Sequence, residues 1–349
     1  MTTRAWNDIS RRILGGRLLV SRPMRDGSPL VTVITPAYNV GAWIGDAVSS
    51  VLAQTERRFE YIVVDDGSTD DTADIVRTAA AGDDRVRFRS SGNGGSAAAR
   101  NLGLAEASAP FIAFLDGDDR WNATFLERQL AVLQAAPADV GAVFCHTRVM
   151  LENGHVVAWR WQPAGPCDFD LLLAENNPMH NGSSLLIRRS CFDETGVFDT
   201  SLPSATDFDM WMRIAAKSST PVFWGSRRYL LDMRLMRTGS ISANRGARFA
   251  GLDTILAEYA PLMARLHPGL AYVRPAVFAY RDGFDDFGDR WASEAQKAGT
   301  AALVKSVWGQ AMVVWNRSSP SGRARLRSAR DAIRARVYGG ISRAQRFVG

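Results

Sequence analysis

Three acidic residues follow directly on an apolar segment in FIAFLDGDD, residues 111–119. Residues 111–115 have the composition of a strand buried on both faces, and Asp116, Asp118 and Asp119 crowd together where it ends. Carboxylates at this spacing repel one another, so a positive group is expected among them. The alternative is a solvated acid cluster that caps a helix beginning at residue 121.

Two other loops follow predicted strands and carry unusual residues, TPAYN at 35–39 and DDGSTDD at 65–71. In an open parallel sheet, ligands bind at the carboxyl ends of the strands, where such loops converge. Each loop alone is weak evidence, because DDGS is also an ordinary turn and helix cap. The three loops together, in this order, predict a ligand site at one edge of a sheet.

The elements that must position these loops alternate along the chain from residue 30. β-branched and apolar runs predict strands, and apolar residues that recur with helical spacing predict helices between them. This alternation predicts an α/β fold with a mostly parallel sheet covered by helices on both faces. The predicted strands are 30–35, 61–65, 85–89 and 111–116, and the predicted helices are 42–54, a segment after residue 66, and 96–107.

The alternation loosens after residue 120, where we expect both helices and strands. From about residue 243 the strand signals disappear, which predicts a helical C-terminal region that includes an amphipathic segment at 300–315. Before it, the sequence predicts helices at 121–136 and 206–216, strands at 140–148 and 183–188, and a turn at 153–154.

Four segments together resemble the donor half of the family 2 glycosyltransferases, which have the GT-A fold. They are VTVITPAYNVGAWIGDAVSSVLAQT, FEYIVVDDGSTDDT, GNGGSAAARNLGLAEA and FIAFLDGDD, and the resemblance covers roughly residues 29–240. It implies an inverting enzyme that moves a sugar from a nucleotide diphosphate sugar, usually a UDP-sugar, to a hydroxyl of an acceptor. The expected acceptor is a glycan or a lipid-linked glycan in the synthesis of surface polysaccharide or another glycoconjugate.

The resemblance also implies which residues bind the donor. Asp118 is expected to bind a divalent metal, Mg2+ or Mn2+, while Asp116 contacts the ribose or shares the ion, and Gly117 lets the backbone come close. Oxygen ligands of this kind suit both ions. Asp66 matches the acid that accepts the uracil N3–H group. Pro36, Ala37 and Tyr38 would line the same pocket, and Arg100 would offset negative charge near the donor, unless it is a helix-surface arginine.

The same family places a general base at the start of a helix, and here TGVFDTSLPSATDFDMWMR (195–213) puts Asp207 at that position. Such a base removes the proton of the acceptor hydroxyl. Asp209 is a competing candidate, and Asp207 could instead be a plain helix cap. The stretch departs from the family pattern at Thr206, where Glu is common, and at Thr200. Arg237 stands where many relatives have a metal-binding His, which puts the strength of metal dependence in doubt.

The charges are unevenly distributed over the 349 residues. Residues 317–349 carry a net charge of +8, residues 1–27 carry +4, and the middle of the chain carries −6. An acidic body argues against nucleic-acid binding, whereas basic ends suit an anionic membrane surface or act as solubilising tails. No apolar stretch approaches the roughly 18–20 residues of a membrane span, and arginines interrupt the only candidate signal peptide. We therefore expect a cytoplasmic protein, with peripheral attachment to the inner face of the plasma membrane as an option. Self-association is equally compatible with the sequence.

These patterns predict four regions. They are a basic N-terminal segment (1–28), a GT-A domain (29–242) with a nucleotide-binding half (29–120) and an acceptor half (121–242), a helical extension (243–316) and a basic tail (317–349). Two other functions fit parts of the sequence. FLDGDD resembles the aspartate pair of haloacid-dehalogenase phosphatases, but the chain has only three lysines, and that pair should follow the first strand. The second alternative is a catalytically inactive nucleotide-sugar-binding or scaffold protein of a glycan-assembly complex.

Overall fold

The computed structural model describes residues 28–160, 162, 164–169, 172, 179, 181–235, 244–266 and 285–297. The chain divides into two compact units, residues 1–260 and 261–349. Helix α9 (Arg245–Leu266) crosses this division, and α11 (Asp285–Lys297) belongs to the second unit. All other elements described below belong to the first unit.

The first half of the sheet is entirely parallel, as the alternation of strands and helices predicts. Its strands lie in the order β3-β2-β1-β4, and each pair of neighbours is parallel. The elements are β1 (Val31–Ala37), α2 (Gly41–Leu52), β2 (Phe59–Asp65), α3 (Thr72–Ala79), β3 (Val86–Ser90), α4 (Gly95–Glu106) and β4 (Phe111–Phe114).

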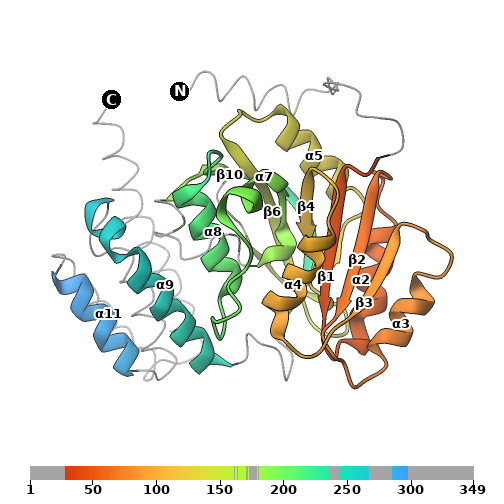
Figure 1. Cartoon of the computed structure of the whole chain (residues 1–349), viewed down its shortest axis with the longest axis horizontal. Coiled ribbons are helices and arrows are strands. Elements are labelled where there is room, and N and C mark those ends of the chain that lie inside the picture. Colours follow the sequence, from red (N-terminus) through yellow and green to blue (C-terminus); the bar gives the residue numbers. More distant parts are fainter. Residues whose placement is uncertain are drawn as a thin grey trace, which may run out of the picture. The chain divides into compact units, whose positions relative to one another are not determined.

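Strand β2 shows why this half needs helices on both faces. Tyr61 and Val63 are fully buried in the large core cluster that also holds the apolar face of α2. The alternate residues Ile62 and Val64 pack with Ala99 of α4 in a second cluster. Because successive side chains of a strand point to opposite faces, α2 and α4 cover opposite faces of the sheet (Figure 1).

The second half of the sheet is mixed. Strand β9 is antiparallel to both β4 and β6, β10 is parallel to β6, and β5 pairs antiparallel with β10. The hairpin strand β7 pairs with β6, and β8 pairs with β10. The elements are β5 (Arg120–Trp121), α5 (Phe125–Ala135), β6 (Val140–Met150), β7 (Val156–Arg160), β8 (Gly165–Cys167), η1 (Gly182–Ser184), β9 (Leu185–Arg188), α7 (Arg189–Thr195), α8 (Thr206–Lys217) and β10 (Val222–Arg234).

Several elements in this half differ from the sequence prediction. The helix expected at 121–136 begins at Phe125, because Arg120 and Trp121 pair with β10 instead. The strand expected at 183–188 starts as the short helix η1. Strand β10 was not predicted as an element, because Gly225 and the polar residues after it interrupt its apolar pattern. That interruption is a bulge, since β10 breaks register with β6 between Gly225 and Tyr229.

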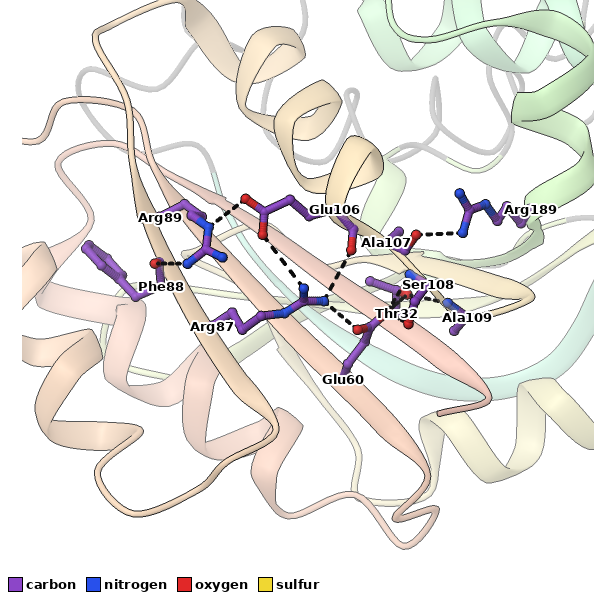
Figure 2. A network of polar contacts seen from close by, with 10 residues as sticks. All are labelled: Thr32, Glu60, Arg87, Phe88, Arg89, Glu106, Ala107, Ser108, Ala109 and Arg189. Carbon is purple, nitrogen blue, oxygen red and sulfur yellow. Dashed lines mark hydrogen bonds and ion pairs between the residues drawn. The ribbon is translucent and has the colours of Figure 1, made fainter. Parts of the chain in front are cut away.

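A polar network fastens the amino ends of the parallel strands (Figure 2). Glu60 of β2 accepts hydrogen bonds from the hydroxyl of Thr32 (2.5 Å) and from Ser108 N–H (2.7 Å), and it also pairs with Arg87 of β3. Arg89 Nε donates to Glu106 at the end of α4, at 2.6 Å. The network therefore ties β1, β2 and β3 to the turn between α4 and β4, at the end of the strands opposite the ligand loops.

The helical C-terminal prediction is met where the structure describes it. Helix α9 buries Phe249, Leu252, Ile255, Leu256 and Tyr259, and α11 buries Trp291 and Ala292. The amphipathic segment at 300–315 and the basic ends at 1–27 and 317–349 lie outside the described residues. Within the described residues, none of the helices is both long enough and apolar enough to cross a membrane.

Candidate active site

The loops after β1 and β2 are joined to each other at the carboxyl edge of the sheet. Asp66 N–H donates to the carbonyl of Ala37 at 2.8 Å, and Asn39 N–H donates to Ser68 Oγ at 3.0 Å. The side chain of Asp70 accepts from Gly41 N–H (3.0 Å) and from Thr72 N–H (3.1 Å). Asp70 therefore accepts from the first N–H group of both α2 and α3, and it fixes the two loops side by side.

The three loop residues expected to line a nucleotide pocket differ in exposure. Pro36 is half-buried, Ala37 is buried, and the ring of Tyr38 is 43% exposed. Ala37 therefore contributes its backbone to the loop contact, while the Tyr38 ring is available at the rim. This arrangement offers one aromatic face at the edge of the site.

Asp66 is buried and held by the start of α4. Its Oδ1 accepts from Gly94 N–H at 2.9 Å, and its Oδ2 accepts from Gly95 N–H at 2.7 Å. Oδ1 also accepts from Ser91 Oγ at 3.3 Å, whereas Oδ2 keeps a second lone pair that can accept from a ligand. The helix N-terminus therefore orients an acceptor carboxylate beside the loops of β1 and β2.

Arg100 is buried against Asp116 and is not a helix-surface residue. Its Nη2 donates to Asp116 Oδ1 at 2.7 Å, and only 8% of its side chain is exposed. The guanidinium also lies over the ring of Phe198, 5.7 Å from the ring centre. The backbone N–H of Asp116 donates to Ser183 Oγ of η1 at 3.0 Å. Asp116 is thus held from two sides, while 29% of its side chain stays exposed.

Gly117 has a packing role in the acidic loop. A Cβ at this position would lie 3.0 Å from Val40 Cγ2 and 3.1 Å from Ile44 Cδ1. The missing side chain therefore lets the loop approach the start of α2 closely. It places Asp116 and the half-buried Asp118 at the edge of the sheet.

Asp119 is the buried member of the acid cluster. Burial raises the pKa of Asp119 well above its usual range, and the negative charges of Asp118 and Asp116 raise it further. Its oxygens accept from Asn181 Nδ2 and from the backbone N–H of Arg234, each at 3.0 Å. Through these two bonds, the buried Asp119 fastens the acidic loop to Asn181 and to the end of β10.

Arg234, the last residue of β10, was not identified as a site residue from the sequence. Only 3% of its side chain is exposed. Its guanidinium donates to the carbonyl of Asp118 (3.0 Å), the carbonyl of Glu152 (2.8 Å) and Asp46 Oδ2 (3.0 Å). Arg234 therefore ties the acidic loop to α2 and to the β6–β7 turn. The only signal in the sequence is an arginine that ends an apolar run.

Asp207 lies in the first turn of α8, and its charge is coupled to the donor side of the site. Burial raises the pKa of Asp207, the positive charge of Arg100 opposes that rise, and the negative charge of Asp116 adds to it. Its Oδ1 accepts from Phe208 N–H at 2.8 Å. Because the charges of Arg100 and Asp116 both act on Asp207, the three residues lie within electrostatic range of one another, as a candidate base requires.

The competing residue Asp209 has a different environment. It is buried, and Arg213 donates to its Oδ2 through Nε (3.0 Å) and Nη2 (2.7 Å). Both donations engage Oδ2, so Asp209 is committed to an ion pair within its own helix, and no charge effect of Arg100 or Asp116 acts on its pKa. Of the two acids, Asp207 is therefore the better candidate base.

The turn that precedes α8 is strained and tightly packed. Ala205 has a φ of 62°, in the left-handed region that a non-glycine residue adopts only at a cost of about 1–3 kcal/mol. A Cβ on Gly251 of α9 would collide with the carbonyl group of Ser204. Helix α9 thus reaches the turn only because residue 251 is glycine, and this contact holds the start of the helix that carries Asp207.

The oxygen atoms near the acidic loop suit a hard divalent cation. Asp116 and Asp118 offer carboxylates, and Asn181 Oδ1 is buried without a hydrogen-bond partner among the described residues. Such all-oxygen donor sets are typical of Mg2+ and Mn2+. The described part of the chain contains no group of three or more His, Cys, Asp or Glu side chains that could hold a metal.

Two residues of the motifs discussed above do not contribute to this description. Arg237 lies outside the described residues. Trp211 is fully buried in the core, packed edge-on against Phe198 and Phe223 at 6.3 and 6.2 Å between ring centres.

Comparison with known proteins places these features among glycosyltransferases. The profile of "Glycosyl transferase family 2" matches residues 32–196. TuaG of Bacillus subtilis, described as a "Putative teichuronic acid biosynthesis glycosyltransferase", is 32% identical over 224 residues, which cover 64% of this chain and 85% of TuaG. A glycosyltransferase of Rickettsia felis is 29% identical over 197 residues, or 55% of this chain. The match spans only 32% of that rickettsial protein, about a third of its length.

Two solved structures share the fold. Residues 1–349 of TarS from S. aureus, solved in complex with UDP-GlcNAc, align with a TM-score of 0.55 at 17% identity and cover 80% of this chain and 91% of that one. The mannosyltransferase PcManGT of Pyrobaculum calidifontis, in complex with GDP-Man and Mn2+, aligns with a TM-score of 0.55 at 19% identity. That alignment covers 96% of this chain and 93% of PcManGT.

Proposed function

Because this chain belongs to glycosyl transferase family 2 and has the GT-A fold, we propose that it is an inverting glycosyltransferase. The proposed reaction moves a sugar from a nucleotide diphosphate sugar, most simply a UDP-sugar, to a hydroxyl of a glycan or lipid-linked acceptor in polysaccharide synthesis. The observation that carries the proposal is the gathering of Asp66, the Arg100–Asp116 pair and Asp207 at one edge of the sheet. The names of TuaG and of the TarS complex with UDP-GlcNAc support a surface-polymer acceptor and a UDP-sugar donor.

In the proposed donor site, the β1 and β2 loops hold the nucleotide. Asp66 would accept the N3–H group of uracil, because its carboxylate is already fixed by Gly94 and Gly95. Pro36 and Ala37 would line the pocket, and the exposed ring of Tyr38 would cover the base. Arg100 would stay paired with Asp116, and together they would face the ribose and the diphosphate.

A divalent metal would be held by Asp118. Asp116 lies nearby, as does Asn181 Oδ1, which has no hydrogen-bond partner among the described residues. Such an ion neutralises the charge that develops on the departing diphosphate. Diphosphate oxygens would supply the remaining ligands, which suits ions that are bound by only one or two carboxylates. The Mn2+ in the PcManGT complex supports this assignment.

In the proposed transfer, Asp207 accepts the proton of the acceptor hydroxyl. As the acceptor oxygen forms its bond to the anomeric carbon, the bond from that carbon to the diphosphate oxygen breaks on the opposite face, and the configuration inverts. The bonding electrons leave with the nucleoside diphosphate, and the proton stays on Asp207. A raised pKa makes Asp207 a stronger base than an ordinary aspartate, while the charge of Arg100 keeps its ionised form accessible.

Attachment to a membrane remains a proposal based on the basic ends of the chain. If residues 317–349 bind anionic lipid, flotation with anionic liposomes should fall steeply with salt and disappear when the chain is truncated at Arg317. Binding that ignores both changes would contradict this attachment.

The donor site can be tested by calorimetric titration with UDP, with and without Mn2+. We expect Mn2+ to tighten UDP binding to the wild-type protein and to have no such effect on Asp118→Ala. Failure of UDP to bind under either condition would contradict the proposed donor. UDP binding without turnover of any nucleotide sugar would favour the alternative of an inactive binding or scaffold protein. Thr206, which stands where Glu is common in the family, is compatible with that alternative.

A further inference from the structure

On its outer edge, strand β10 has a gap between two partner strands. There β8 pairs with Phe223–Gly225 and β5 pairs with Leu231–Asp232, and among the described residues no strand pairs with the segment between them. Between Gly225 and Tyr229, β10 also has three residues where β6 has one. The extra residues form a bulge that pushes Arg227 and Arg228 outward, and both are exposed.

The bulge and the start of α5 enclose a concavity of about 340 Å³. Three arginines line it: Arg128 of α5, and Arg227 and Arg228 of β10. None of these three forms an ion pair with an acid among the described residues. Asn122 also lines the concavity, and because its Oδ1 accepts from Thr124 N–H (3.1 Å), its amide NH2 group remains available as a donor.

Many other arginines of the first unit form an ion pair with a carboxylate, unlike the three at the concavity. Arg58, Arg85 and Arg213 each pair with a carboxylate within 2.8 Å. Beside the concavity, Asp232 pairs with both Arg120 (3.0 Å) and Arg148 (2.5 Å). Some other arginines of this unit also lack an acid, but Arg57 and Arg188 donate to backbone carbonyls instead. The three at the concavity differ because they lie together around one hollow.

The nearest acid in sequence does not neutralise the cluster. Glu127 precedes Arg128, but its Oε2 accepts from the hydroxyl of Thr55 at 2.7 Å. The positive charge of Arg227 also reaches the interior, where it adds to the effect of burial in lowering the pKa of His146. The field of the cluster is therefore positive both at the surface and beneath it.

We propose that the concavity lined by Arg128, Arg227 and Arg228 is a second anion site, which binds the phosphate group of a phosphorylated saccharide or of a lipid headgroup. Guanidinium groups bind phosphate through paired, charge-assisted hydrogen bonds, and the amide of Asn122 adds a neutral donor. Strand β5 leads directly from the acidic loop to Asn122. A phosphate held there would anchor a molecule at the end of β5 that is farther along the chain from the acidic loop, without occupying the donor pocket.

The test measures phosphate binding by the full chain with the donor pocket saturated by UDP and Mn2+. The variant is Arg227→Gln/Arg228→Gln. The matched control is Arg57→Gln/Arg77→Gln, which removes two exposed positive charges from residues that do not line the concavity. Calorimetry with inorganic phosphate and with glucose 1-phosphate measures the affinity for soluble ligands. Sedimentation with phosphatidylcholine vesicles, with and without phosphatidic acid, measures binding to the lipid headgroup.

We expect the concavity variant to lose about tenfold or more in affinity for at least one phosphate-bearing probe, because it removes two guanidinium groups that would make charge-assisted hydrogen bonds to phosphate. The control should stay within about twofold of wild type, the scatter that surface charges produce. A loss with the soluble probes alone assigns the site to a phosphorylated saccharide, and a loss with the vesicles alone assigns it to a lipid.

Equal affinities of both variants for all probes, or equal losses in both, would overturn the proposal. UDP affinity, measured separately, should be unchanged in both variants. A protein that does not bind UDP would contradict the proposed donor site and leave the phosphate comparison intact, so the two failures are distinguishable.

Discussion

Replacing Arg234 with methionine should loosen the acidic loop and lower the free energy of unfolding by an amount that the structure allows us to estimate. The substitution removes the donors to the Asp118 and Glu152 carbonyls, at 3.0 and 2.8 Å. The third bond, to Asp46, is worth little because that carboxylate is 57% exposed. Hydrogen bonds that involve a charged group contribute about 1.5–3 kcal/mol each, and because neighbouring bonds are not additive we expect a total loss of about 3 kcal/mol.

For a domain of this size, that loss corresponds to a fall in melting temperature of about 6–12 °C. Arg188→Met is the matched control. Arg188 is also partly buried and donates to two backbone carbonyls, those of Val140 (2.9 Å) and Leu133 (3.0 Å), far along the sheet from the acidic loop. Both variants should lose a similar amount of stability in thermal unfolding.

The two variants should differ in donor binding. Calorimetry with UDP and Mn2+ should show a weaker Mn2+-dependent gain in affinity for Arg234→Met and an unchanged gain for Arg188→Met. An Arg234→Met protein that is destabilised but keeps the full gain would refute the idea that Arg234 positions the acidic loop.

Three other predictions concern Asp207, Glu60 and Gly251. Asp207→Asn should lower kcat by about 10²–10⁴-fold with UDP affinity unchanged. In wild type, kcat/KM should rise with pH through a pKa above that of an ordinary aspartate; a pH profile that is flat there would contradict the role. Since a raised folded-state pKa costs stability as pH increases, Asp207→Asn should also unfold at a higher urea concentration than wild type at neutral pH. Burial raises the pKa of Glu60, but bonds from Thr32 and Ser108 and the charge of Arg87 outweigh it, so the pKa is lowered. Glu60→Gln should therefore be less stable than wild type in urea at neutral pH, and this difference should shrink as pH falls below about 4.3, the usual pKa of Glu; a constant difference would contradict this. Gly251→Ala should reduce kcat more than UDP affinity, because the new methyl group displaces the turn before Asp207; an unchanged kcat would show that the turn does not need this contact.

The parallel half of the fold could be predicted from the sequence because its strands are continuous apolar runs. Such runs end where the buried sheet ends, so the loops at 35–39, 65–71 and 116–119 could be located with the strands that precede them. Strand β10 could not be predicted in the same way. Its bulge places two arginines in the middle of the strand, and bulges depend on the partner strand and not on local sequence.

The candidate site residues also differ in whether local sequence identifies them. Asp116, Asp118 and Asp207 stand in motifs that resemble those of the family, so the sequence offers them together as candidates, and their roles stay predictions. Arg234 could not be identified in this way, because its contacts reach Asp118, 116 positions away in sequence, and Asp46, 188 positions away. Such distant pairs form only when the fold brings β10 beside the acidic loop.

The central claim, that this chain transfers a sugar from a nucleotide diphosphate, is tested most directly by turnover of the donor. The measurement is release of nucleoside diphosphate from a panel of UDP- and GDP-hexoses in the presence of Mn2+, with wild type and Asp207→Asn compared on every donor. We predict that wild type releases nucleoside diphosphate from at least one donor and that Asp207→Asn releases it far more slowly. Release by neither protein from any donor, or equal release by both, would contradict the account.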